Sequence, residues 1–218
     1  MLAALVCAVP LTVSADARSR YKADTCRTPE GKAIPCDELK QAEAPPPRYP
    51  NAARIAPEFP KSKIGKQWDT LVKAATATPS DANATIAAAQ VVLANPDASR
   101  NEKSEAAYQI AMAYLSRDSR AFAEPIKYLQ LAITTDGLNN NQHYSGMLLL
   151  SQMLLGEQKY EQSLQYVERF AKETGVEDLA VLRVQGNDLY RLNRYAQAVP
   201  VLEKAYALDK GADPNLGA

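Results

Sequence analysis

The sequence predicts an all-α protein: a solenoid of about four helical hairpins that follows a signal peptide and a proline-rich, irregular N-terminal segment. Two features of the 218 residues support this fold class. The chain has only nine glycines and is rich in alanine, the residue that most favours helix. Eight of its 14 prolines lie between Pro29 and Pro60, whereas nine of its 11 tyrosines lie from Tyr108 onward. An irregular N-terminal part is therefore joined to an aromatic, helical part.

The charge balance argues against one broad class of function. The 25 Lys and Arg residues equal the 25 Asp and Glu residues, so the formal net charge is zero. A neutral chain has no general attraction for a polyanion, which disfavours a nucleic-acid binder of the basic-patch type. Hydrophobic residues make up 46% of the chain, which is enough to build a core.

Residues 2–13 form an apolar run (LAALVCAVPLTV) that is shorter than the roughly 20 residues needed to span a bilayer. Ala15 and Ala17 then supply the small residues that precede a cleavage site after Ala17. We therefore expect residues 1–17 to be a signal peptide and the mature protein to be periplasmic, with no stable membrane span. Because no Lys or Arg precedes the run, a buried N-terminal helix is the alternative.

Signal cleavage would leave two cysteines, Cys26 and Cys36. An even pair in an exported chain suggests a disulfide, here closing the short loop CRTPEGKAIPC. A zinc site is a weaker alternative, because two thiols without a nearby His supply half of the ligands. A redox-active pair would prefer Cys-x-x-Cys spacing. Residues 18–60 are thus assigned to this loop and a linker, mostly irregular.

The linker contains three consecutive prolines, Pro45 to Pro47, which favour an extended polyproline II conformation. It is interpreted as a semi-rigid spacer, or as a segment that docks in an aromatic groove or along the protein's own helices. The seven residues Pro47–Ala53 (PRYPNAA) resemble the P-x-Y-P-x-x-A start of the C-terminal domain of TonB-type energy transducers. That resemblance implies a TonB-linked role.

Internal repeats follow the linker. Trp68 is followed by Leu71 at +3, Ala84 at +16, Ala88 at +20 and Pro96 at +28. This spacing resembles the W-x2-L…A-x3-F…P pattern of the tetratricopeptide repeat (TPR) family. Second-helix positions separated by 41, 38 and 35 residues repeat the pattern, at Ala84, Pro125, Ser163 and Ala198.

The resemblance assigns residues 61–210 to a TPR-like array and 211–218 to a tail. Small residues are expected where helices approach closely, and large residues where they fill gaps. An irregular helical bundle is the alternative.

No catalytic constellation is visible. The single histidine, His143, is interpreted as a solvated residue of the Asn-rich connection 137–142. Glycine-rich phosphate motifs are absent, and no His and carboxylate cluster has metal-ligand spacing. We therefore expect no enzymatic activity, cofactor or metal ion.

The TPR resemblance implies that the first helix of each hairpin lines a concave groove. Such a groove would run from apolar and aromatic to basic and polar, and would suit a segment with apolar anchors and one carboxylate. Its apolar members could instead be core residues. The residues at the groove positions are Tyr108, Met112, Leu148, Gln152, Leu155, Arg183, Asn187, Tyr190 and Arg191.

The sequence also predicts how the two ends of the array are covered. Repeat arrays normally need a polar capping helix. The last helix is expected to be partly uncovered and to pack on a second copy as a homodimer, on another partner or under the linker. Residues 55–59 could fold back over the first hairpin. The uncovered positions would be Val199, Leu202, Ala205 and Tyr206.

The function expected from these features is that of a non-enzymatic periplasmic TPR adaptor or scaffold of a Gram-negative bacterium. It would bind a protein or peptide segment within a cell-envelope complex. The alternative is an accessory factor of the TonB system or of outer-membrane assembly that uses the Pro-Arg-Tyr-Pro segment, 47–50. A small-molecule enzyme is the third hypothesis, and it would need a cluster of titratable residues.

Overall fold

A computed structural model describes three stretches of the chain: residues 25–27, 33–35 and 47–209. The chain divides into two compact units, Met1–Pro46 and Pro47–Ala218.

In the first unit, strands β1 (Thr25–Arg27) and β2 (Ala33–Pro35) pair antiparallel, with Cys26 opposite Ile34. Cys36, the expected signal peptide and the tail lie outside the described residues. The Cys26–Cys36 disulfide and the cleavage site therefore stay predictions.

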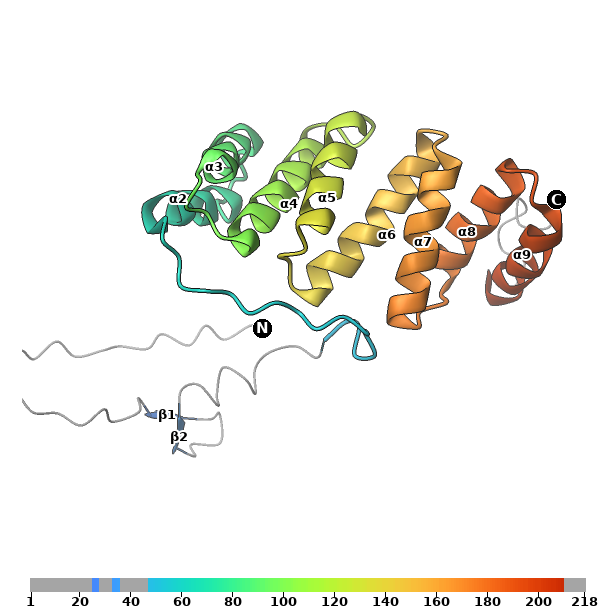
Figure 1. The fold of residues 1–218 in the computed structure, drawn as a ribbon, viewed down its shortest axis with the longest axis horizontal. Helices are drawn as coiled ribbons and strands as arrows, with labels where there is room; N and C mark the ends of the chain where they lie inside the picture. Colours follow the sequence, from blue (N-terminus) through green and yellow to red (C-terminus); the bar gives the residue numbers. More distant parts are fainter. Residues whose placement is uncertain (1–24, 28–32, 36–46, 210–218) are drawn as a thin grey trace, which may run out of the picture. The chain divides into compact units, whose positions relative to one another are not determined.

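The second unit contains eight helices in the part that the structure describes, each packed against the next helix in the chain (Figure 1). They form four hairpins in a row, and between residues 47 and 209 there are only helices, turns and irregular segments. The all-α class is thereby confirmed for this unit. The helices are α2 (Gly65–Ala75), α3 (Ala82–Ala94), α4 (Arg100–Arg117), α5 (Ala123–Thr135), α6 (Asn140–Gly156), α7 (Tyr160–Thr174), α8 (Leu179–Arg191) and α9 (Tyr195–Asp209).

Equivalent positions on the second helix of each hairpin pack inward. The first set, spaced by 40, 38 and 35 residues, is Thr85, Pro125, Ser163 and Ala198. The residues four positions later are Ala89, Leu129, Val167 and Leu202, and the residues three further on are Val92, Ala132, Phe170 and Ala205. All are buried except Leu202, which is half-buried. The hairpins are therefore repeats in their packing as well as in their order.

The first hairpin differs from the expected register by one residue. Ala84 is exposed and Ala88 is half-buried, whereas Thr85 and Ala89 are buried. Asp81 caps α3 and accepts a hydrogen bond from the backbone N–H of Ala84, which places Ala84 in the solvent-facing first turn. Because each residue rotates a helix by about 100°, a shift of one position selects a different face.

Small side chains lie where helices cross, as expected. A Cβ atom on Gly186 would come within 2.5 Å of the Leu202 side chain, so this glycine sets the approach of α8 to α9. In the preceding hairpin, Ser163 Oγ donates a 2.8 Å hydrogen bond to the carbonyl oxygen of Ser151. A small hydroxyl thus joins α6 to α7 without holding them apart.

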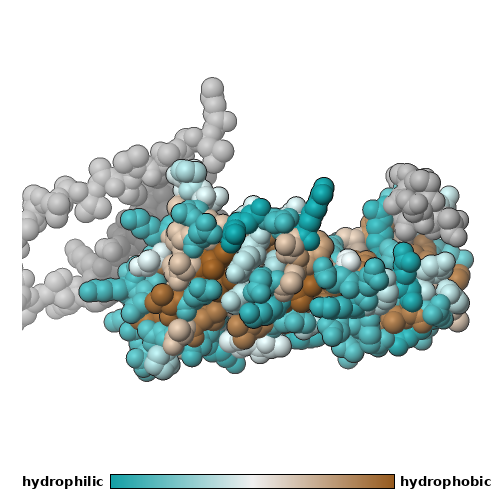
Figure 2. Space-filling model, turned by 90° about the horizontal axis from the view of Figure 1, so that it is seen from above, coloured by the Kyte–Doolittle hydropathy of each residue, from teal (hydrophilic) through white to brown (hydrophobic). Residues whose placement is uncertain are grey.

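The outer side of α9 is partly uncovered. Val199 is 54% exposed, whereas its equivalents Ile86, Ile126 and Leu164 are at most 8% exposed because the next hairpin covers them. Tyr206 is also exposed, and Leu202 is half-buried. The expectation was wrong for Ala205, which is fully buried because it faces the inner side of the helix. The face of the molecule in Figure 2 is mainly hydrophilic, with hydrophobic patches between polar side chains.

One buried carboxyl group lies in the interior of the last two hairpins. Asp188 on α8 is fully buried, and neither of its carboxyl oxygens has a hydrogen-bond partner among the described residues. Burial raises the pKa of Asp188 to about 7. The nearby Ser163 hydroxyl lowers the pKa of Asp188, but by less than burial raises it. The folded protein therefore retains a proton on this group over a range in which the unfolded chain has lost it.

The raised pKa of Asp188 predicts that stability falls as pH rises from about 4 to about 7 and then levels off. In D188N the amide cannot ionise, so this contribution is removed. A one-unit pKa shift corresponds to about 1.4 kcal/mol, so we expect the wild-type Tm to fall by several degrees across this range relative to D188N.

Thermal melts followed by circular dichroism at pH 5 and pH 8 measure this difference. The matched control is D97N, which changes an exposed aspartate in the α3–α4 connection. Equal pH slopes for wild type and D188N would contradict the assignment.

Candidate functional site

Residues 47–54, here called the strap, form an irregular segment that packs across the ends of α5, α6 and α7 (Figure 1). Its anchor is Tyr49, which is 6% exposed. The Tyr49 ring lies 5.5 Å from the rings of Tyr144 and Phe170, edge to face with both. Its hydroxyl lies 3.1 Å from Ser145 Oγ. An aromatic side chain of the linker thus belongs to the core of the helical unit.

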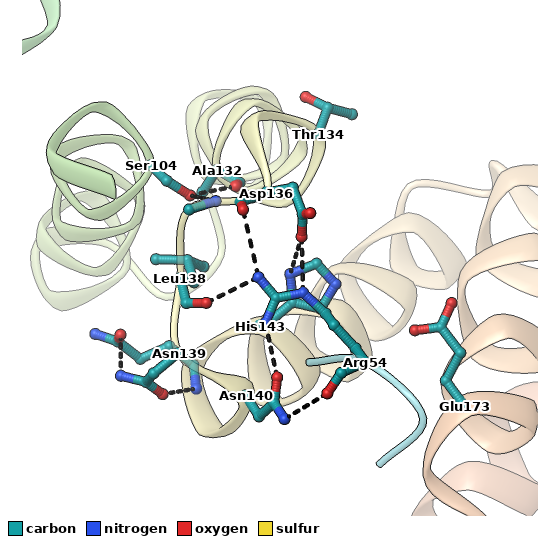
Figure 3. Close-up of polar contacts among 12 residues, drawn as sticks. Arg54, Ser104, Ala132, Thr134, Asp136, Leu138, Asn139, Asn140, His143 and Glu173 are labelled. Carbon is teal, nitrogen blue, oxygen red and sulfur yellow. Dashed lines mark hydrogen bonds and ion pairs between the residues drawn. The ribbon is translucent and has the colours of Figure 1, made fainter. Parts of the chain in front are cut away.

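Arg54 is the second anchor of the strap (Figure 3). It donates from Nε to Asp136 Oδ1 at 2.7 Å, from Nη1 to Asn140 Oδ1 at 2.7 Å and from Nη2 to the Leu138 carbonyl oxygen at 2.9 Å. The Asn140 amide donates back to the Arg54 carbonyl oxygen at 2.9 Å. Asp136 ends α5 in a left-handed conformation (φ 57°), so the cation lies where the helix dipole is negative.

Main-chain contacts complete the attachment. The Ala53 N–H donates to the Glu173 carbonyl oxygen at 2.9 Å, at the end of α7. The Arg48 N–H donates to Asn141 Oδ1 at 3.0 Å, on the first turn of α6. The two prolines of the strap have no N–H to satisfy. Of the interpretations of the linker, docking along the protein's own helices is the one that these contacts confirm.

The segment after the strap does not cover the first hairpin as expected. Ile55 is 93% exposed, and Phe59 is more than half exposed. The connection is held instead by Ser62, whose hydroxyl donates to a carboxylate oxygen of Glu102, and by Ile64, which is buried beside α2. Between Arg54 and Ser62 the chain therefore crosses the surface with Ile55 and Phe59 in solvent.

The interpretation of His143 as a solvated loop residue was wrong. Asn139 caps α6, so the Asn-rich stretch is the first turn of that helix and His143 faces inward, fully buried. Its Nδ1 lies 3.7 Å from Asp136 Oδ1, beside Arg54 (Figure 3). Burial and the positive charge of Arg54 lower the pKa of His143 to about 4, so the ring is neutral at physiological pH. It packs edge to face on Tyr144 and fills space beneath the strap.

The nine residues expected to line a groove lie on the first helices of three consecutive hairpins. None of them is fully buried. The apolar ones contact the core with part of their surface, so their core and surface roles coexist. α4 carries Tyr108 and Met112, α6 carries Leu148, Gln152 and Leu155, and α8 carries Arg183, Asn187, Tyr190 and Arg191.

A cavity of about 330 Å³ lies where α6 meets α8. It brings together three of the expected residues, Leu155 from the end of α6 and Asn187 and Arg191 from α8. The remaining lining comes from the α6–α7 turn and its flanks, Gly156, Gln158 and Tyr160. The Leu155 side chain therefore lines the same cavity as an amide and a guanidinium, which suits a segment with an apolar residue next to a carboxylate or carbonyl group.

Arg183 is engaged in a contact within the chain. Its Nη2 lies 3.1 Å from Asp209 Oδ1, which joins α8 to the end of α9. The Asn187 amide donates to the Arg183 carbonyl oxygen at 2.8 Å, one turn along α8. The basic end of the groove therefore depends on the exposed Arg191 more than on Arg183.

The strap and the groove share one face of α6. Residues 141, 145, 148, 152 and 155 are three or four apart and form a single stripe. The strap contacts the first two, Asn141 and Ser145, and the groove residues are the last three. The repeat pattern does not predict this adjacency. Its only signal was Tyr49, the one tyrosine between Tyr21 and Tyr108, with an arginine five positions later.

A larger cavity, of about 550 Å³, lies between the α4–α5 turn and the end of α6. Tyr114 and Phe122 are among the residues that line it. Arg117 and Arg120 are mixed on its walls with three acidic residues, so the cavity shows no clear preference for ligand charge.

Within the described residues, no three His, Cys, Asp or Glu side chains are grouped so that they could hold a metal ion. Among the same residues, no helix is both long enough and apolar enough to cross a bilayer. No protein-family model matches the chain, and a search of curated proteins finds no match.

The strap contacts predict that Y49A destabilises the folded protein. Truncation of a buried aromatic side chain removes about 3 kcal/mol or more from the free energy of unfolding. R54A should also destabilise, since it leaves Asp136 and the carbonyl end of α5 without their cation. Urea denaturation followed by circular dichroism measures both effects.

The matched control for this experiment is I55A, one residue beyond the strap, where the side chain is in solvent. It should change the free energy of unfolding by less than about 0.5 kcal/mol. A Y49A protein as stable as I55A would show that the strap is not part of the fold.

Proposed function

We propose that this chain is a non-enzymatic adaptor of the TPR type that binds a protein segment along the first helices of its hairpins. The observation that carries the proposal is the cavity where α6 meets α8, in which Leu155, Asn187 and Arg191 come together. The TPR resemblance predicts all three as groove residues, and two different hairpins contribute them.

Support for the TPR type comes from the packing. Four hairpins follow one another, and three equivalent second-helix positions face inward in each. The spacing of 40, 38 and 35 residues approaches the 34-residue TPR period toward the C-terminus. Small residues at the crossings of the last two hairpins, such as Ser163 and Gly186, fit the same architecture.

The proposed partner segment carries an apolar residue beside an acidic side chain or a terminal carboxylate. The apolar residue would contact Leu155, and the carboxylate would accept hydrogen bonds from Arg191 and Asn187. The apolar run at 2–13 and the expected Cys pair favour the periplasm and a cell-envelope complex as the setting. The alternative role in the TonB system gains no support from the strap, because its Tyr49 is buried in the chain's own core.

We also propose a contact between two copies of the chain through the outer side of α9. The residues that are equivalent to Val199 in the other hairpins are all covered by a following helix. At the opposite end of the row, α2 presents Lys66, Asp69 and Lys73 to solvent. A symmetric pairing of two α9 faces would therefore bury apolar surface on both copies. A pairing of α9 with α2 would place the same apolar surface against charged side chains.

Charge reversal at Arg191 tests the adaptor proposal. Protein captured from a cell-envelope extract by cross-linking to wild-type bait should fall about tenfold with R191E, since one charge-assisted hydrogen bond is replaced by repulsion. K66E, which changes the net charge equally on α2, is the control and should capture the same partner as wild type. Equal capture by R191E and wild type would contradict the groove assignment.

Sedimentation equilibrium tests the contact between copies. Wild type should show a dimer that V199E converts to a monomer, because a charge is placed in the apolar face. Q197E, on the opposite side of the same helix, should leave the dimer intact. A wild-type monomer at all concentrations would contradict this contact.

A further inference from the structure

The strap is attached as a bound peptide would be, through a few side chains within a short extended stretch. Among residues 47–54 only Tyr49 is buried, while Pro50, Asn51 and Ala53 are exposed. The next residue, Ile55, is almost fully exposed. The contact thus begins and ends within eight residues, and two side chains, Tyr49 and Arg54, make most of it.

The helices present a formed site to this segment. Tyr144 and Phe170 supply an aromatic slot, and Ser145 supplies a hydroxyl for the tyrosine. Arg54 follows Tyr49 by five positions in the strap. Its guanidinium donates hydrogen bonds to the Asp136 carboxylate and the Leu138 carbonyl oxygen. Burial, and then the nearby Glu173 carboxylate, raise the pKa of Tyr144 further above the physiological range, where its phenol is already neutral.

The position of the strap relates it to the groove. It lies on the first turns of the α6 stripe whose later turns carry Leu148, Gln152 and Leu155. Tyr108, the first of the expected groove residues, packs against the same core cluster that contains Tyr49. A segment that followed the whole length of α6 would therefore meet the strap.

We propose that the strap is an exchangeable occupant of its own site beside the predicted groove, and that a partner segment that extends along α6 and carries the same two anchors displaces it. The anchors are a tyrosine and an arginine five residues later in an extended segment, Tyr-x-x-x-x-Arg. The part of the proposal that concerns displacement rests on the adaptor function proposed above. The recognition of Tyr-x-x-x-x-Arg by α5, α6 and α7 stands independently of it.

A covalently attached strap has the advantage of proximity. A short tether gives an effective concentration on the order of 1 mM, so a strap with a micromolar affinity occupies its site almost fully in the intact chain. A free peptide then competes poorly unless the tether is cut. Cutting the tether is therefore the change that exposes the site without altering any of its contacts.

The experiment cuts the chain at its exposed connection. Residues 55–60 are replaced by the site of a specific protease in the full chain, and cleavage leaves the strap as a separate piece. A fluorescent peptide with the sequence of residues 45–58 is then added and its anisotropy is measured. It should bind the cut protein at least about tenfold more tightly than the uncut protein.

Peptide variants test the two anchors. Peptides with the Y49A or the R54A change should bind the cut protein at least about tenfold more weakly than the unchanged peptide, and a peptide with I55A should bind equally well. Circular dichroism of the cut protein confirms that its helices are intact. A failure of the unchanged peptide to bind a cut, helical protein would overturn the proposal, as would equal binding of the Y49A peptide.

Capture from the envelope extract separates the two proposals. The relevant partner is the protein whose capture falls with R191E. If this partner displaces the strap, the cut protein should capture more of it than the uncut protein does. Unchanged capture, together with peptide binding, would overturn the displacement and leave the recognition site. Equal capture by wild type and R191E would instead contradict the adaptor function, whether or not the strap peptide binds.

Discussion

The architecture depends on one packing constraint: a helical hairpin of this sequence cannot cover its own apolar stripe. Ile86, Ile126 and Leu164 are buried because the next hairpin lies over them, whereas Val199 on the last helix is largely exposed. Within a hairpin, small residues let the two helices approach closely. Gly186 on α8 leaves room for the Leu202 side chain on α9, and the Ser163 hydroxyl on α7 donates a hydrogen bond to the Ser151 carbonyl oxygen on α6. Each hairpin is thus stabilised by its neighbours, which is the behaviour of a repeat protein.

The strap adds a long-range contact to an otherwise local structure. Tyr49 and Arg54 reach residues more than 80 positions away, and they join α5, α6 and α7 at one edge of the row. The guanidinium of Arg54 donates at once to Asp136, the C-cap residue of α5, and to Asn140 in the first turn of α6. Beneath it, His143 is held neutral by burial and by that same positive charge. This edge is therefore a folding element, and it adjoins the predicted groove residues of α6.

The most perturbed titratable groups of the described residues lie away from the cavity where α6 meets α8. The two titratable groups whose pKa values depart most from their ordinary ones, His143 and Asp188, are both fully buried. Neither lines the cavity at α6 and α8, where an apolar side chain, an amide and a guanidinium are presented together. Such a set of groups can orient an extended peptide segment. The strap, on an adjoining surface, is an extended segment of the chain itself that these helices bind.

The sequence by itself determined the all-α class, the number of hairpins and their approximate spacing, because alanine content and the recurrence of small and large residues are local properties. It also placed the nine predicted groove residues on first helices. It did not determine the register of the first hairpin, where the Asp81 cap turns Thr85 rather than Ala84 inward. Only the tertiary structure decided that Tyr49 and Arg54 belong to the core, that His143 is buried and that Arg183 pairs with Asp209. Each of these depends on a partner that is distant in the chain and is brought near by stacking, so no local pattern could reveal it.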